Sequence, residues 1–187
     1  MNDYLTVDRS ISQNGTAHFI EKDYNMALSG FLKIRDIAGE SKRADHEDEI
    51  DVHGMQWGIR QGKSARVGRG RSRSRAKVDS LVVTKFTDAA SPYLALASMQ
   101  GKSFPEIILS VRKDSGEAHL DYLVITMTNC SITAFAMDND GSDADLLALT
   151  ERVGIQFEKV KMIYTVQADD HSAGDEHEIE YDIAAGV

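Results

Sequence analysis

Apolar and polar residues alternate along most of the chain after residue 26, and a period of two predicts β-strands. The expected strands are residues 28–36, 50–59, 81–86, 106–113, 120–137, 152–166 and 178–183. We expect residues 120–137 to form one long or bulged strand and residues 152–166 another, with a possible bulge at 158–159. The last strand alternates cleanly, which is typical of an edge or interface strand.

One segment, residues 91–100, has the composition of a helix. Ser91 suits the N-cap, Pro92 suits the first helical position, and Gly101 can end the helix. The chain is therefore expected to be mainly β with one helix, which favours a sandwich or a barrel.

The stretch from residue 39 to residue 85 holds the strongest charge contrast. An acidic turn at 39–49 leads into a strand in which His53, Met55 and Trp57 share one face and Gln56 lies on the other, between two glycines. A loop at 60–77 follows, and it contains eight basic residues and no carboxylate: Arg60, Lys63, Arg66, Arg69, Arg71, Arg73, Arg75 and Lys77. In an extended chain the last four arginines would lie on one side, roughly 6.6 Å apart. An acidic turn and a basic loop on one chain indicate self-association.

The length of 187 residues fits one domain that needs neither a disulfide nor a metal to fold. We expect residues 1–25 to be an N-terminal extension of unknown role and residues 26–187 to be the domain. A net charge of −9 argues against nucleic-acid binding over the whole surface. No apolar run is long enough to cross a bilayer, and the first nine residues lack a Sec-type signal pattern, so we expect folding in the cytoplasm.

No arrangement of residues predicts catalysis, a metal site or a cofactor. The six histidines are scattered, and no serine or cysteine stands in a glycine-flanked elbow. The acidic residues of 45–49 are adjacent rather than spaced for metal ligation. The segment 138–145 resembles a calcium loop, but Ala136 and Leu147 occupy the positions of its first and last carboxylates. Cys130 lies in a strand-like run and is interpreted as a small buried side chain.

The arginine loop leaves two interpretations open. Its guanidinium groups could dock on carboxylates of a neighbouring copy, for which Glu47, Asp48, Glu49 and residues 138–145 are candidates. They could instead bind phosphates of a single nucleic-acid strand. The loop lacks the aromatic residues on which single-strand binders stack bases, which weakens the second interpretation.

A collinear set of short motifs resembles the haemolysin-coregulated protein (Hcp) family of the bacterial type VI secretion system. The set consists of residues 31–34, 39–42, His46, 49–52, 57–58, 85–86, 90–92, 101–102, Pro105, 111–113 and 122–123. The resemblance covers about residues 26–166. It implies a β-barrel of two sheets with one flanking helix, similar to phage tail-tube proteins, and a non-enzymatic tube subunit.

The resemblance further implies homo-hexameric rings that stack into a tube inside a contractile sheath. Expected partners are other copies of the chain, a VgrG-type spike, sheath and baseplate proteins, and small effectors carried in the lumen. The tube is expelled, so the protein is expected to be cytoplasmic first and extracellular afterwards. We expect Arg66, Arg69, Arg71, Arg73 and Arg75 to meet Glu47, Asp48 and Glu49 at the stacking interface, and Gln56 to face the lumen. Two features depart from the family: the arginine content of the loop and the extension before Met26.

Overall fold

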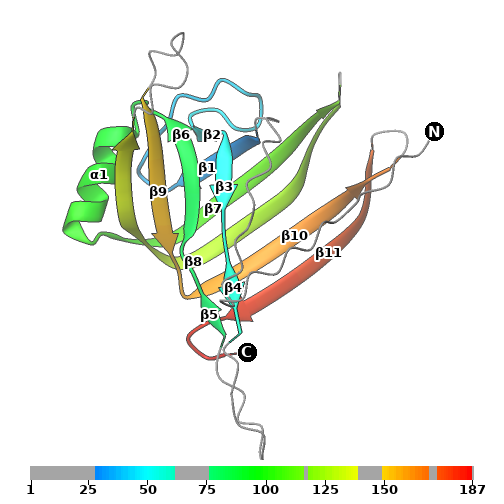
Figure 1. The fold of residues 1–187 in the computed structure, drawn as a ribbon. Coiled ribbons are helices and arrows are strands. Elements are labelled where there is room, and N and C mark those ends of the chain that lie inside the picture. The colour runs from blue at the N-terminus through cyan, green and yellow to red at the C-terminus, as the bar shows by residue number, and fades with distance from the viewer. Residues whose placement is uncertain (1–27, 62–75, 116–117, 139–148, 169–171, 187) are drawn as a thin grey trace, which may run out of the picture.

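The computed structural model describes residues 28–61, 76–115, 118–138, 149–168 and 172–186, and these form a mainly β fold with one helix (Figure 1). In chain order the elements are β1 Ser29–Ile34, β2 Ile50–Val52, β3 Gly54–Gln56, β4 Ile59–Arg60, β5 Lys77–Val78, β6 Leu81–Phe86, α1 Ser91–Gln100, β7 Ser103–Ser115, β8 Ala118–Asp138, β9 Thr150–Gln156, β10 Lys159–Gln167 and β11 Ala173–Asp182. The expected class is confirmed. Residues 1–25, most of the arginine loop and most of segment 138–145 lie outside the described residues.

Nine strands form one antiparallel sheet, with β2, β1, β7, β8, β9, β6 and β3 hydrogen-bonded in that order. β4 and β5 form a separate two-stranded ribbon. β8 is long enough to pair with three strands of the large sheet. β7 lies along one edge of β8, and β10 and then β9 lie along its other edge. Its register shifts between Ile132 and Ala134, so the expected long, bulged strand is confirmed.

The sheet curves until its two ends meet at His53. The backbone carbonyl of His53 accepts a hydrogen bond from Leu28 at 3.3 Å, and its N–H donates to the Thr84 carbonyl at 2.9 Å. β2 before it pairs with β1, and β3 after it pairs with β6. The expected single strand at 50–59 is therefore three short strands, because the chain changes partners along its length.

A second strand expectation was also wrong in part. Residues 152–166 form two strands, β9 and β10, which break at Phe157 and Glu158. β9 lies between β8 and β6, whereas β10 turns away to pair with β11 and the first half of β8. The Glu158 N–H donates to the Thr128 carbonyl at 3.1 Å, so the break is a change of partner rather than a bulge. β11 pairs with β10 alone among the described strands, as an edge strand does.

The inner face of the sheet carries the core. Leu32, Leu109 and Ile125 lie opposite one another across β1, β7 and β8, and none is more than 1% exposed. Burying a side chain of this size contributes roughly 1.5 to 3 kcal/mol. The period of two in the sequence marks these positions correctly.

α1 packs along β8 at one side of the sheet and buries Leu94 and Ala97 (Figure 1). Gly101 ends it in the left-handed region at φ 62°, as expected. The expected N-cap is wrong: Ala90 holds that position, and Ser91 is the first helical residue. The Ser91 hydroxyl is instead part of a buried ionic cluster described below.

Candidate functional site

Residues 39–49, the acidic turn, are held in a compact shape by backbone hydrogen bonds. The Gly39 N–H donates to the Asp48 carbonyl at 2.8 Å, and the Ser41 N–H donates to the Glu49 carbonyl at 3.0 Å. A Cβ at position 39 would lie 2.4 Å from the Glu49 carbonyl oxygen, so only glycine fits there. Asp45 and Asp48 adopt positive φ, which aspartate tolerates better than most residues.

His46 fixes this turn to the sheet. Its ring stacks on Phe31 with centroids 4.1 Å apart, and its nitrogens lie 2.7 Å from a Glu49 carboxylate oxygen and 3.0 Å from an Asp121 carboxylate oxygen. Both partners are hydrogen-bond acceptors, so both contacts are hydrogen bonds only when the imidazole carries two N–H groups. Arg112 completes the cluster by donating to Asp121 at 2.6 Å.

The charges of this cluster act on Asp121. Burial alone would raise the pKa of its carboxyl group, but the hydrogen bond and charge of Arg112, followed by those of His46, outweigh burial and lower that pKa. Arg112 also lies over the Phe31 ring, 5.4 Å from its centroid. The acidic turn is therefore anchored on the outer face of β1 and β7 by His46 and Arg112.

The structure brings Glu47, Asp48 and Glu49 together in this turn, but they are not equivalent. Glu49 is only 11% exposed and contacts both His46 and Lys33, at 2.7 Å and 3.7 Å. Glu47 and Asp48 are exposed and line a shallow cavity with Lys33 and Asp36. Two of the three expected acidic residues are thus available to a partner.

The other expected site residues are the five loop arginines and Gln56. Arg66, Arg69, Arg71, Arg73 and Arg75 lie outside the described residues. Gln56 ends β3, is exposed, and pairs with Val82. Its neighbour Met55 pairs with the fully buried Val83, so Gln56 lies on the face of the sheet that points away from the core.

A second ionic cluster is buried where β6, β9 and α1 meet. The Lys85 ammonium group donates to Glu151 at 2.9 Å, to Asp88 at 2.7 Å, to the Ser91 hydroxyl at 3.1 Å and to the Phe86 carbonyl at 2.6 Å. The Lys85 and Glu151 side chains are 0% exposed. One ammonium group thus pairs with two carboxylates, and the formal net charge of the cluster is −1.

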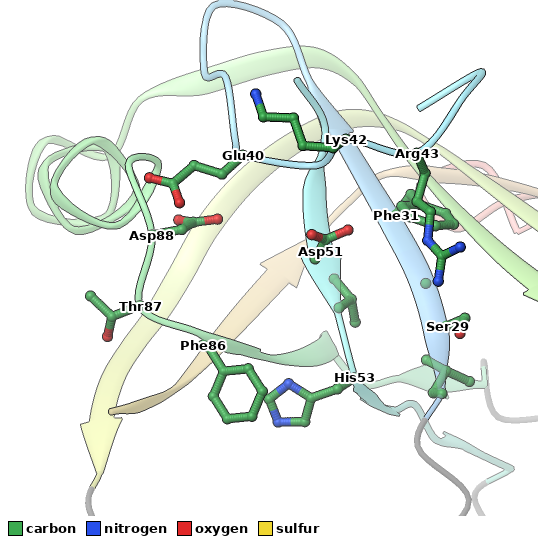
Figure 2. A pocket seen from close by; sticks show the side chains of 13 residues that line it. Ser29, Phe31, Glu40, Lys42, Arg43, Asp51, His53, Phe86, Thr87 and Asp88 are labelled. Atoms are coloured by element: carbon green, nitrogen blue, oxygen red, sulfur yellow. The ribbon is translucent and has the colours of Figure 1, made fainter. Parts of the chain in front are cut away.

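A cleft of about 570 Å³ lies between the acidic turn and this cluster (Figure 2). The side chains that Figure 2 labels around it are Ser29, Phe31, Glu40, Lys42, Arg43, Asp51, His53, Phe86, Thr87 and Asp88. β1, β2 and the end of β6 form its walls. Glu40 closes one side by accepting a hydrogen bond from the Ala89 N–H at 3.1 Å.

An aromatic pair and a carboxylate stand in the cleft. The rings of His53 and Phe86 stack with centroids 4.3 Å apart at one end, and the Asp51 carboxylate lies between them and the acidic turn (Figure 2). Phe86 is 43% exposed. Burial, followed by the charge of Lys85, lowers the pKa of His53. The stack therefore consists of two uncharged rings at neutral pH. Among the residues that the structure describes, Asp51 has no hydrogen-bonding or ionic partner.

His53 lies on a different face from the one its sequence position predicts. It stacks on Phe86, whereas Met55 pairs with Val83, and Phe86 and Val83 point to opposite faces of β6. The alternation is interrupted between β2 and β3, where the chain changes partners. The sequence does not reveal Asp51, His53 and Phe86 as a group. Asp51 and His53 lie in and just after β2, whereas Phe86 ends β6, and only the folded sheet brings them together.

No reactive centre emerges from the described part of the chain. It contains no group of three or more residues able to hold a metal ion. Cys130 is buried, which raises the pKa of its thiol to about 12 and keeps it in the unreactive protonated form. The described residues also include no helix long and apolar enough to span a membrane.

Comparisons with known proteins agree on one family. Residues 31–164 match the family described as "Type VI secretion system effector, Hcp". The chain is 35% identical to protein hcp1 of Pseudomonas aeruginosa over 145 residues, which are 78% of this chain and 88% of that protein. Hcp1 from Salmonella typhimurium is a solved structure with a TM-score of 0.69 and 32% identity, covering 86% of this chain and 97% of that one. A second solved structure, of a type six secretion system protein, has a TM-score of 0.77 over 86% and 99% of the two chains; its 23% identity supports the fold alone.

Proposed function

The chain belongs to the Hcp family of the type VI secretion system, and we propose that it is a structural subunit of the tube that this system expels. The observation that carries the proposal is the family match over residues 31–164, which runs from β1 into β10 and so includes nearly the whole sheet. Residues 1–27 precede this match and the described fold.

We propose that six copies form a ring and that rings stack head to tail. A head-to-tail assembly needs two unlike surfaces on one subunit. The chain supplies a basic segment, in which Arg66, Arg69, Arg71, Arg73 and Arg75 lie, and an acidic turn that presents Glu47 and Asp48. The hydrogen bonds that fix the acidic turn support this role, because a rigid receptor loses little entropy on binding.

The proposed tube carries small effector proteins in its lumen, with Gln56 as a contact to them. Its exposure, and its place on the face away from the core, support that role. The proposed partners outside the ring are a VgrG-type spike, the contractile sheath and the baseplate. The protein would fold in the cytoplasm and leave the cell when the tube is expelled.

We propose that the protein acts without catalysis. His46 has a carboxylate on one ring nitrogen, as a catalytic base often does, but its other nitrogen is occupied by a second carboxylate, so Glu49 and Asp121 leave neither nitrogen for a substrate. It is also only 5% exposed, so no substrate reaches it. Its geometry serves to anchor the acidic turn.

Native mass and negative-stain images of the purified protein, at low and high salt, test the proposal. A sixfold mass with annular particles supports the tube subunit, and stacks that shorten at high salt support ionic ring-to-ring contacts. A monomer at every salt concentration contradicts the ring. In that case, binding of single-stranded nucleic acid by the arginine segment becomes the function to test, through titration with labelled oligonucleotides at several salt concentrations.

A further inference from the structure

The cleft beside β2 has the chemistry of a guanidinium-binding site. Asp51 offers a carboxylate that has no partner among the described residues, and Phe86 with His53 offers an exposed aromatic surface. Arginine is the side chain that uses both, since its planar fork hydrogen-bonds carboxylates while its face stacks on aromatic rings.

The position of the cleft relative to the basic segment points to a second copy. β4 and β5, which lead into and out of that segment, lie in the lower part of Figure 1, and β6 runs upward from there towards α1 at the upper left. Phe86 is the last residue of β6, so it marks the end of the subunit far from the ribbon. The β4–β5 ribbon and the cleft therefore lie at opposite ends of β6, and they face each other when subunits are placed head to tail along β6.

We propose that the cleft receives an arginine side chain from residues 66–75 of a second copy, which pairs with Asp51 and stacks on Phe86. Charge complementarity supports this occupant: residues 66–75 contain five arginines and no carboxylate. The inference rests on the proposed stacking of rings and adds to the acidic turn a second receptor surface for the arginine segment. Lys42 stands at the rim opposite the aromatic pair, and the Asp51 carboxylate lies between that rim and the pair (Figure 2).

A labelled peptide with the sequence of residues 64–77 tests the cleft directly, by fluorescence anisotropy against the full-length protein. We expect Asp51→Asn to weaken binding about tenfold, as expected for loss of a hydrogen bond to a charged group. Phe86→Ala should also weaken it, and so should replacing the peptide's arginines with lysines, which keep the charge but lose the planar stack. Glu106→Gln removes an exposed carboxylate on β7, outside the cleft, and should leave binding unchanged.

Two outcomes overturn the inference. Equal peptide affinity for the wild type and Asp51→Asn excludes the cleft, and equal losses in Asp51→Asn and Glu106→Gln show only a general charge effect. Negative-stain images of the same variants separate this inference from the proposed function. Asp51→Asn should give intact single rings with fewer stacks, whereas a failure of the tube proposal leaves the wild type itself without rings.

Discussion

Lys85 and Glu151 face each other inside the protein, with the ammonium nitrogen 2.9 Å from a carboxylate oxygen and neither side chain exposed. They join β6 to β9, and Ser91 joins α1 to both by donating to Glu151 at 2.8 Å. One oxygen of Glu151 is buried without a hydrogen-bond partner among the described residues. The cluster therefore fixes the helix on the sheet, but its polar groups are not fully satisfied.

Removing Lys85 should be strongly destabilising, because Asp88 and Glu151 then lose the only cation that pairs with them among the described residues. We expect Lys85→Met to cost about 3 to 5 kcal/mol of unfolding free energy, measured by urea denaturation. The double variant Lys85→Met with Glu151→Leu should cost clearly less than the sum of the two single changes. Additive losses would show that the two side chains do not interact.

Alanine substitutions at Gly39 and Gly101 test the close packing of the acidic turn, with Gly101 as the control. An alanine Cβ at position 39 would meet the Glu49 carbonyl at 2.4 Å, whereas at position 101 no atom lies within 4 Å and only the φ of 62° is unfavourable. We expect Gly101→Ala to cost about 1 kcal/mol. Gly39→Ala should cost about 3 kcal/mol and expose residues 39–49 to limited proteolysis. Equal losses, with no new cleavage in the turn, would contradict the close packing described here.

The sequence predicts this fold well where a single period governs a segment. Leu32, Leu109 and Ile125 are recognisable as core positions because each lies in a strand with one buried face. The break at His53 is not predictable in this way, since it depends on β1 and β6 competing for the same short segment. A local pattern contains no information about which edge a strand will pair with.

The sequence does not predict the two ionic clusters either, because the paired residues are far apart in the chain. Lys85 and Glu151 are 66 residues apart, and His46 and Asp121 are 75 residues apart. A lysine within an alternating strand looks like a solvent-facing residue, and only the paired carboxylates make its burial possible. The resemblance to Hcp proteins marked Lys85 and His46 as members of shared motifs, and the structure supplies the reason: both anchor loops to the sheet.

His53 predicts an acid-dependent loss of stability. Its pKa is lowered in the folded protein, so its contribution is complete above the unfolded value of about 6.5. As the pH falls from 6.5 towards the folded pKa, the unfolded state takes up the proton first and folding weakens. Urea denaturation at pH 7 and pH 5 should show a smaller acid loss for His53→Gln than for the wild type. An identical loss in both proteins would assign the acid effect to other groups.

The arginine segment should control stacking but not ring formation. Changing Arg69, Arg71, Arg73 and Arg75 to glutamate reverses four charges opposite an acidic receptor, so we expect rings without stacks in negative-stain images. The same four positions changed to lysine keep the charge and should retain part of the stacking. Stacks that persist in the glutamate variant would show that this segment does not join rings.

Gln56 tests the proposed lumen. If it faces the cavity of a ring, Gln56→Arg brings six added positive charges into a confined space, where they strengthen or weaken the binding of effectors according to effector charge. We expect the variant to assemble normally, because residue 56 is exposed and lies on the face of the sheet that points away from the core, and to change which effectors are exported. Gln100→Arg, an exposed change at the end of α1, is the matched control and should leave export unchanged. Quantitative proteomics of secreted fractions gives the measurement. An unaltered set of exported effectors in Gln56→Arg would contradict a lumen-facing position for residue 56.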